Sequence, residues 1–134
     1  MIDRLFTYGT LEISSVVKRV LGRDLVGRPA VLNDYARYLV RGESYPAIRE
    51  EPGSAIRGTL YDGIDGELFR RLDKYEGEEY RKRPVQVLTD DGRPHHAFVY
   101  TCSADLLSDQ PWDQAAFIAH HLGEFMDARS SMIE

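Results

Sequence analysis

The sequence predicts an α+β fold with a mainly β core that can close as a small barrel. Three observations predict it. Segments rich in β-branched and aromatic residues, separated by turn residues, occupy most of the chain. Apolar residues recur at helical spacing near the start, in the middle and near the end. No internal repeat, low-complexity tract or linker interrupts the 134 residues, so we expect a single domain over residues 1–134.

The first two expected elements are a strand and a helix. Residues 4–8, RLFTY, are rich in aromatic and other strand-forming residues. Between residues 12 and 22, apolar side chains recur at a spacing that places them on one helical face, and Gly22 is a suitable stop. The residues on that face are Ile13, Val16, Val17, Val20 and Leu21.

Several strands are expected between residues 27 and 63. Residues 27–42 and 44–55 mix strand-forming residues with Pro, Gly, Asn and Asp, which indicates strand segments interrupted by turns. Residues 55–63, AIRGTLYDG, indicate a further strand. The turns are expected near Asn33-Asp34, at Gly42 and near Pro52-Gly53.

The remaining expected elements are a helix, a hairpin and a terminal helix. Asp65 can cap the first of these helices. Residues 83–101 indicate a hairpin with Asp91-Gly92 at its turn. Pro111 suits the first turn of the terminal helix. The apolar face of the first helix is Leu68, Phe69, Leu72 and Tyr75, and that of the terminal helix is Trp112, Ala115, Ala116, Ala119, Leu122 and Met126.

Composition and charge argue against several classes of partner. The formal net charge is −5, the isoelectric point is near 5.4 and no Lys/Arg-rich run occurs, so we expect neither nucleic acid nor a membrane as a partner. No apolar run approaches the length of a membrane span. The single cysteine, Cys102, and the lack of a secretory pattern in the first residues favour a cytoplasmic location. No long heptad pattern indicates an oligomer, so the oligomeric state stays open.

The stretch LFTYGTL, residues 5–11, is a candidate ligand-binding loop. A loop between a strand and a helix carries backbone N–H groups without partners inside the helix, and the helix dipole favours an anion or a carbonyl oxygen there. Gly9 lacks the Cβ that would keep a ligand away from the backbone. Taken alone, the stretch is more simply explained as a plain turn, and both interpretations stay open.

Acidic residues gather at the end of the second expected helix. For most of them a solvated helix end is a sufficient explanation. Glu76 differs, because it follows Tyr75 on the apolar face and precedes Gly77, where a helix would end. Desolvation in a partly dry pocket would raise the pKa of such a carboxyl and suit it to base catalysis, with the solvated helix end as the alternative. The cluster comprises Asp73, Glu76, Glu78 and Glu79.

The other reactive residue types form no recognisable site. His95-His96 and His120-His121 are adjacent pairs, and neighbouring side chains on a strand or helix point in different directions, so neither pair can chelate one metal. With one cysteine and no ligand spacing, no metal site is expected. Cys102 is interpreted as a core residue. The sequence contains no G-x-S-x-G elbow, and no dinucleotide or P-loop motif follows Gly9.

Three stretches taken together resemble a known family. They are LFTYGTL at residues 5–11, YPAI at residues 45–48, and GTLYDG with LFRRLDKYEGEEYRKRPVQV within residues 58–87. In order and spacing they are similar to the γ-glutamylcyclotransferase-like superfamily, in its AIG2-like branch, over residues 5–100. The pairing of YGTL with the later LDKYEG is the more specific part of the resemblance.

The resemblance implies a compact β-barrel with flanking helices and a small-molecule substrate. Characterised members convert a γ-glutamyl or γ-glutamylamine substrate to 5-oxoproline and a free amine, without a metal or cofactor. The catalytic glutamate of the family falls on Glu76. The expected substrate-binding residues are Tyr8, Gly9, Thr10, Leu11, Tyr45 and Tyr80. Where the family often has Tyr-x-Arg, this chain has Tyr80-Arg81-Lys82 with Arg83 one place later, so the role of the basic residue is open.

Three functions would use these same residues. The first is a cyclising enzyme, which the retention of both the loop and Glu76 favours. The second is a non-catalytic protein that binds an amino-acid-like or amine ligand on the same scaffold. The third is a related amide-transfer or maturation step on a γ-glutamyl-protected amine. In each case we expect residues 41–55 to form pocket walls that set the specificity.

Overall fold

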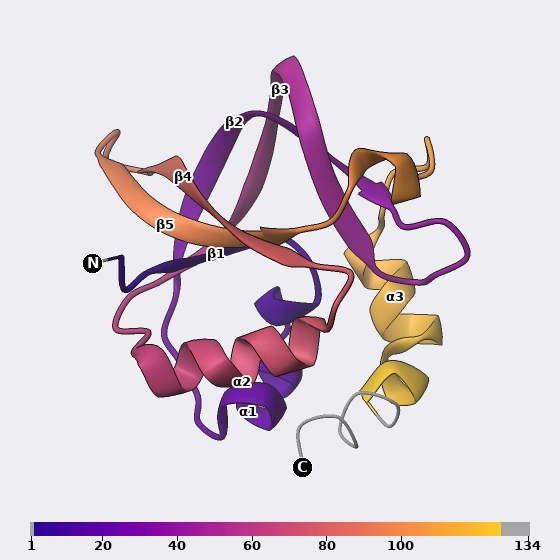
Figure 1. The fold of residues 1–134 in the computed structure, drawn as a ribbon, viewed down its shortest axis with the longest axis horizontal. Helices are drawn as coiled ribbons and strands as arrows, with labels where there is room; N and C mark the ends of the chain where they lie inside the picture. Colours follow the sequence, from indigo (N-terminus) through magenta and orange to yellow (C-terminus); the bar gives the residue numbers. More distant parts are fainter. Residues whose placement is uncertain (1, 127–134) are drawn as a thin grey trace.

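A closed barrel of five strands forms the centre of the computed structural model, which describes residues 2–126 (Figure 1). The order around the barrel is β1-β3-β2-β4-β5. Neighbouring strands pair antiparallel, except that β1 runs parallel to β5. The predicted α+β class with a small mixed barrel is therefore confirmed. The strands are β1 (Leu5–Thr7), β2 (Arg28–Leu39), β3 (Pro46–Tyr61), β4 (Arg81–Thr89) and β5 (Pro94–Thr101).

Two helices pack against each other beneath the barrel, α1 (Ser14–Leu21) and α2 (Gly66–Glu76) (Figure 1). Helix α1 ends at Gly22, whose φ of 75° suits glycine. Helix α2 begins after Asp65, whose carboxylate accepts a hydrogen bond from the Leu68 N–H at 2.9 Å, as the capping pattern predicts. Within residues 2–126, no helix is both long enough and apolar enough to span a membrane.

The terminal helix, α3 (Gln114–His120), begins later than the sequence predicts. Pro111 is not in its first turn, because Asp113 caps the helix by accepting a hydrogen bond from the Ala116 N–H at 3.2 Å. The predicted apolar face is correct only in part: Trp112 is buried and Leu122 and Met126 pack against the core, but the three alanines do not. Phe117 and Phe125, which lie outside the predicted stripe, are buried in place of the alanines, because burying an aromatic ring removes far more apolar surface from water than burying an alanine. The exposed residues of the predicted stripe are Ala115, Ala116 and Ala119.

The long strands β2 and β3 correct two predicted turns. The chain does not reverse at residues 33–34 or 52–53, which instead face each other across an irregularity in the β2–β3 pairing. Asp34 and Gly53 both have positive φ, and the Gly53 N–H donates to the Asp34 carboxylate at 3.1 Å. Turn-forming residues therefore mark a bulge here. The predicted turn at Gly42 does separate the two strands.

Two apolar clusters lie on the two faces of the strands. Leu5 belongs to the outer cluster, between barrel and helices, whereas its neighbour Phe6 belongs to the inner one. Successive strand residues point to opposite faces, so a short strand such as β1 can contribute to both. Tyr8, just after β1, also belongs to the inner cluster. A short 3-10 turn, η1 (Thr10–Glu12), then joins β1 to α1, and its Leu11 belongs to the outer cluster.

Candidate active site

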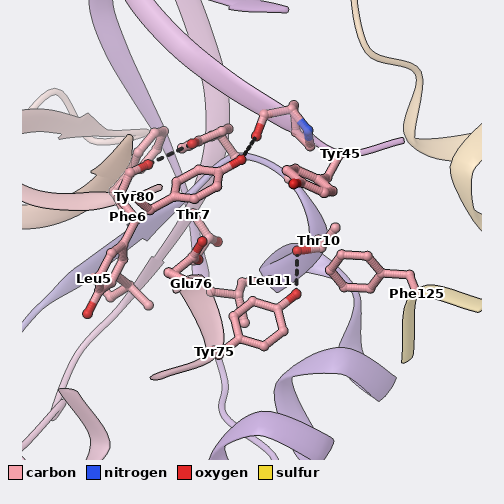
Figure 2. A pocket seen from close by; sticks show the side chains of 14 residues that line it. Leu5, Phe6, Thr7, Thr10, Leu11, Tyr45, Tyr75, Glu76, Tyr80 and Phe125 are labelled. Atoms are coloured by element: carbon pink, nitrogen blue, oxygen red, sulfur yellow. Dashed lines mark hydrogen bonds between the residues drawn. The ribbon is translucent and has the colours of Figure 1, made fainter. Parts of the chain in front are cut away.

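A pocket opens between the loop that follows β1 and the C-terminal end of α2 (Figure 2). It contains about 440 Å³ of empty space, including its opening to solvent. Its walls come from segments far apart in the sequence: the loop, the start of β3, the end of α2 and the C-terminal helical segment. Every site residue predicted from the sequence lines it: Tyr8, Gly9, Thr10, Leu11, Tyr45, Glu76 and Tyr80.

Gly9 stands where a side chain would collide with Pro46. A Cβ at Gly9 would lie 2.7 Å from Cγ and 3.3 Å from Cδ of Pro46. Pro46 is the first residue of β3 and belongs to the YPAI motif. The two sequence motifs therefore meet at this contact. From the sequence, we expect Gly9 to let a ligand approach the backbone. In the structure, Gly9 also lets Pro46 pack against the loop.

The loop offers hydrogen-bond donors rather than acceptors. All four carbonyl oxygens from Tyr8 to Leu11 already accept a hydrogen bond from the protein. In contrast, the hydrogen bonds of the described residues include none donated by the N–H groups of Gly9, Thr10 or Leu11. A run of N–H groups that donate to no other described residue suits an anion or a polarised carbonyl oxygen. The four bonds are Arg37 Nη1 to Tyr8 O (2.5 Å), Glu12 N to Gly9 O (3.0 Å), Ile13 N to Thr10 O (3.1 Å) and Tyr61 Oη to Leu11 O (3.1 Å).

Glu76 is the last residue of α2, and its half-buried side chain lines the pocket. Tyr75 faces the apolar core, and successive helical residues are turned by about 100°, so Glu76 reaches a different surface from its neighbour. Gly77, with a φ of 77°, ends the helix immediately afterwards. Figure 2 shows the Glu76 side chain between Tyr80 and Tyr75. A carboxylate is thus placed in the same pocket as the N–H groups of the loop.

Tyrosine hydroxyls hold the pocket walls in place. Tyr8 donates to the Tyr100 carbonyl at 2.6 Å, and Tyr80 donates to the Pro46 carbonyl at 2.7 Å. Burial, followed by the negative charge of Glu76, raises the pKa of Tyr8 well above its usual value. Burial likewise raises the pKa of Tyr80. The Tyr8 hydroxyl proton is therefore directed to a backbone carbonyl of the protein.

Several residues of the pocket were not predicted from the sequence. The Tyr75 hydroxyl lies 2.7 Å from the Thr10 Oγ1, joining the loop to α2 (Figure 2). Phe125 lies against Tyr45, with ring centroids 6.1 Å apart. Tyr75 and Phe125 carry only an apolar signal in the sequence, which indicates core rather than pocket. Pro46 also lines the pocket and was not predicted to do so. The sequence did contain a signal for it, because Pro46 lies within the YPAI motif.

Other expectations for the pocket walls need correction. Of residues 41–55, only Tyr45 and Pro46 line the pocket within the described chain, because β3 carries residues 47–55 away along the barrel and residues 42–44 line a separate groove. The basic residue after Tyr80 also lies elsewhere. The Lys82 Nζ sits 4.5 Å from the centroid of the Phe69 ring, outside the set of lining residues. Its contact is a cation–π interaction with the apolar exterior of the barrel.

Within residues 2–126, the structure places the Cys102 thiol in the core and groups no set of side chains that could hold a metal ion. Burial raises the pKa of the Cys102 thiol to about 11, so little thiolate is present at neutral pH. Cys102 is 9% exposed, as expected for a core residue. Among the described residues, no group of three or more His, Cys, Asp or Glu side chains is arranged to hold a metal ion. Among the described residues that line the pocket, Glu76 is the one that carries a carboxylate.

A second, more open groove adjoins the pocket and shares Tyr45 and Glu76 with it. Most of its other titratable side chains are carboxylates, and the sequence-based expectation that they are solvated is met, since they are exposed. The groove is lined in addition by Asp73, Lys74, Gly77, Glu78 and Glu79.

Known proteins share both this fold and this sequence pattern. The family model described as "Gamma-glutamyl cyclotransferase, AIG2-like" matches residues 5–116. Protein AIG2 B of Arabidopsis thaliana is 27% identical over 133 residues, which cover 97% of this chain and 79% of that protein.

Solved structures agree on the fold. A solution structure of an Arabidopsis thaliana protein has a TM-score of 0.71 at 24% identity, covering 98% of this chain and 81% of that chain. A structure named γ-glutamyl cyclotransferase has a TM-score of 0.67 at 15% identity, covering 98% of this chain and 87% of that chain. The family match extends over most of the chain, including the loop and Glu76. The chain belongs to the AIG2-like γ-glutamyl cyclotransferase family.

Proposed function

We propose that the protein is an enzyme that cyclises a γ-glutamyl or γ-glutamylamine substrate to 5-oxoproline and releases an amine, with Glu76 as general acid and base. One observation carries the proposal: a loop that offers N–H donors and a single carboxylate line the same pocket. The family to which the chain belongs supports the general kind of activity. The specific substrate and the cytoplasmic location are parts of the proposal.

The reaction needs one proton to move twice. The α-amine of the substrate attacks its own γ-carbonyl carbon, and Glu76 takes the proton that the amine must lose. When the bond between the γ-carbon and the leaving nitrogen breaks, Glu76 returns that proton to the leaving amine. The products are 5-oxoproline and the free amine, and no water is consumed. One carboxylate suffices if it reaches both nitrogens.

The rest of the pocket supplies geometry and electrostatics. Because the attack is intramolecular, holding the substrate in a ring-closing pose contributes much of the rate. The N–H groups of Gly9, Thr10 and Leu11 stabilise the oxygen of the tetrahedral intermediate or hold the α-carboxylate of the substrate. Tyr8, Tyr45 and Tyr80 act as walls, since the hydroxyls of Tyr8 and Tyr80 donate to backbone carbonyls.

The test is an assay of 5-oxoproline release from a panel of γ-glutamyl amines, γ-glutamyl dipeptides and glutathione. For the best substrate, Glu76→Gln should lower kcat by about 10²–10⁴, the usual contribution of a general acid–base group. The matched control is Glu67→Gln, the same substitution at an exposed position at the other end of α2, which should leave kcat unchanged.

The outcomes separate the candidate functions. Turnover near the wild-type rate in Glu76→Gln would show that the proton shuttle is wrongly assigned. If no compound gives 5-oxoproline but calorimetry detects binding, the protein is a small-molecule binding protein on this scaffold. If 5-oxoproline forms only from substrates with one kind of leaving group, that group defines the substrate class.

A further inference from the structure

Arg37, on β2, contacts the substrate loop from outside the pocket. Its Nη1 donates to the Tyr8 carbonyl at 2.5 Å and lies 3.8 Å from the Glu12 carboxylate. The guanidinium also stacks over the Trp112 ring, 5.4 Å from its centroid. Arg37 is not among the residues that line the pocket. Its contacts therefore fall on the back of the loop, at both of its ends.

Glu12 is itself tied to the barrel. Its second carboxylate oxygen accepts a hydrogen bond from the Thr59 hydroxyl at 3.1 Å, and Thr59 lies in β3 opposite Thr7 of β1. The side chains of Arg37 and Glu12 are 29% and 19% exposed, so water screens their pairing less than it would at the surface. The loop is thus braced between β2 and β3 by side chains that do not reach the pocket.

The planarity of the peptide bond links this brace to the pocket. No peptide bond among the described residues is cis, so the Tyr8 carbonyl and the Gly9 N–H point in opposite directions. Arg37 draws the carbonyl away from the pocket, and the Gly9 N–H must then face the pocket side. Rotation of this one peptide would exchange a donor for an acceptor at the place where the substrate oxygen is expected.

We propose that Arg37 is a positioning residue, which orients the Tyr8–Gly9 peptide so that the Gly9 N–H serves as a donor in the pocket. This inference rests on the proposed function, because it assigns the N–H to a substrate oxygen. The guanidinium is suited to the task, since it presents several donors in a fixed plane. Arg37 does not bind the substrate carboxylate itself, because its contacts are directed to the Tyr8 carbonyl and Glu12.

The test replaces Arg37 by alanine and measures the chemical shifts of the Tyr8–Gly9 peptide. In the isotope-labelled full-length protein, the ¹³C shift of the Tyr8 carbonyl and the ¹⁵N shift of the Gly9 amide should both move in Arg37→Ala. The matched control is Arg49→Ala on β3, which also loses a cation–π contact and ion pairs but does not touch the loop. Both shifts should stay at their wild-type positions in that variant.

Kinetics provide the second readout. A misplaced reacting group costs about 10²-fold, so Arg37→Ala should lower kcat by that order while KM changes little. Free guanidinium ion at millimolar concentration should restore part of the lost rate in Arg37→Ala, and none in Arg49→Ala.

The inference is overturned if the two shifts stay in place in Arg37→Ala, or if KM rises while kcat does not fall. A wild-type protein without cyclase activity would contradict the proposed function, and the two shifts would still decide whether Arg37 sets the orientation of the peptide.

Discussion

The two walls of the pocket are built in different ways. The loop wall, from Tyr8 to Leu11, presents backbone N–H groups, and four separate hydrogen bonds to its carbonyls fix their direction. The helix wall presents two side chains from the end of α2, the Tyr75 ring and the Glu76 carboxylate, and only the carboxylate carries a charge. One wall therefore depends on geometry distributed over many contacts, and the other depends on the chemistry of one group. Substitutions in the loop wall should therefore impair both stability and activity, whereas substitution of Glu76 should impair activity.

The loop wall is most sensitive at Gly9. In Gly9→Ala, the new Cβ would lie 2.7 Å from Pro46 Cγ, so the loop or the start of β3 must shift. We expect the shift to displace the N–H donors and to lower the rate of 5-oxoproline formation by about 10²–10³, the cost of losing one such donor. Melting temperature should fall in the same variant, because the contact is packed.

The control for this prediction is Gly66→Ala at the start of α2, where the nearest atom to a new Cβ is 4.0 Å away. It should keep both rate and melting temperature. If Gly9→Ala behaved like Gly66→Ala in both measurements, the loop would accommodate the new Cβ without loss of function. The loop wall would then not depend on a fixed backbone geometry.

The two walls are also joined, by the hydrogen bond between the hydroxyls of Thr10 and Tyr75. A double-mutant cycle with Thr10→Val and Tyr75→Phe should give a coupling energy of about 0.5–1.5 kcal/mol in unfolding experiments, because the bond is buried. The cycle removes effects that each side chain has on its own. A coupling energy near zero would mean that the loop and α2 are positioned independently.

The sequence predicts which segments form the pocket walls better than it predicts the contacts that fix the walls in place. Periodic apolar residues identify α2 and therefore where it ends, and the glycine between strand and helix identifies the loop. Two of the four hydrogen bonds to the loop carbonyls come from side chains on distant strands, Arg37 on β2 and Tyr61 on β3. Such contacts depend on the register in which distant strands pair, which local patterns do not encode. The bulge at Asp34 was predicted as a turn for the same reason, since its positive φ is compatible with either.

The smallest effect concerns the two glutamates on opposite sides of the loop. Glu76 lies in the pocket, whereas Glu12 lies behind the loop with Arg37. Burial raises the pKa of Glu12 above its usual value of 4.5, and this effect outweighs the hydrogen bond from Thr59 and the charge of Arg37. The folded protein thus binds the Glu12 proton more tightly than the unfolded chain does. Its contribution to stability is full below pH 4.5 and is lost as the pH rises through the higher folded value.

Chemical unfolding between pH 4 and 8 can isolate this contribution. The free energy of unfolding of the wild type, measured relative to Glu12→Gln, should decline as the pH rises through that window, because glutamine does not titrate. Thr59→Val removes the hydrogen bond that favours the charged carboxylate, so the decline should extend to higher pH in that variant. If the difference in unfolding free energy between the wild type and Glu12→Gln did not change with pH, Glu12 would be hydrated. The pairing of Arg37 with Glu12 behind the loop would then be weaker than its geometry indicates.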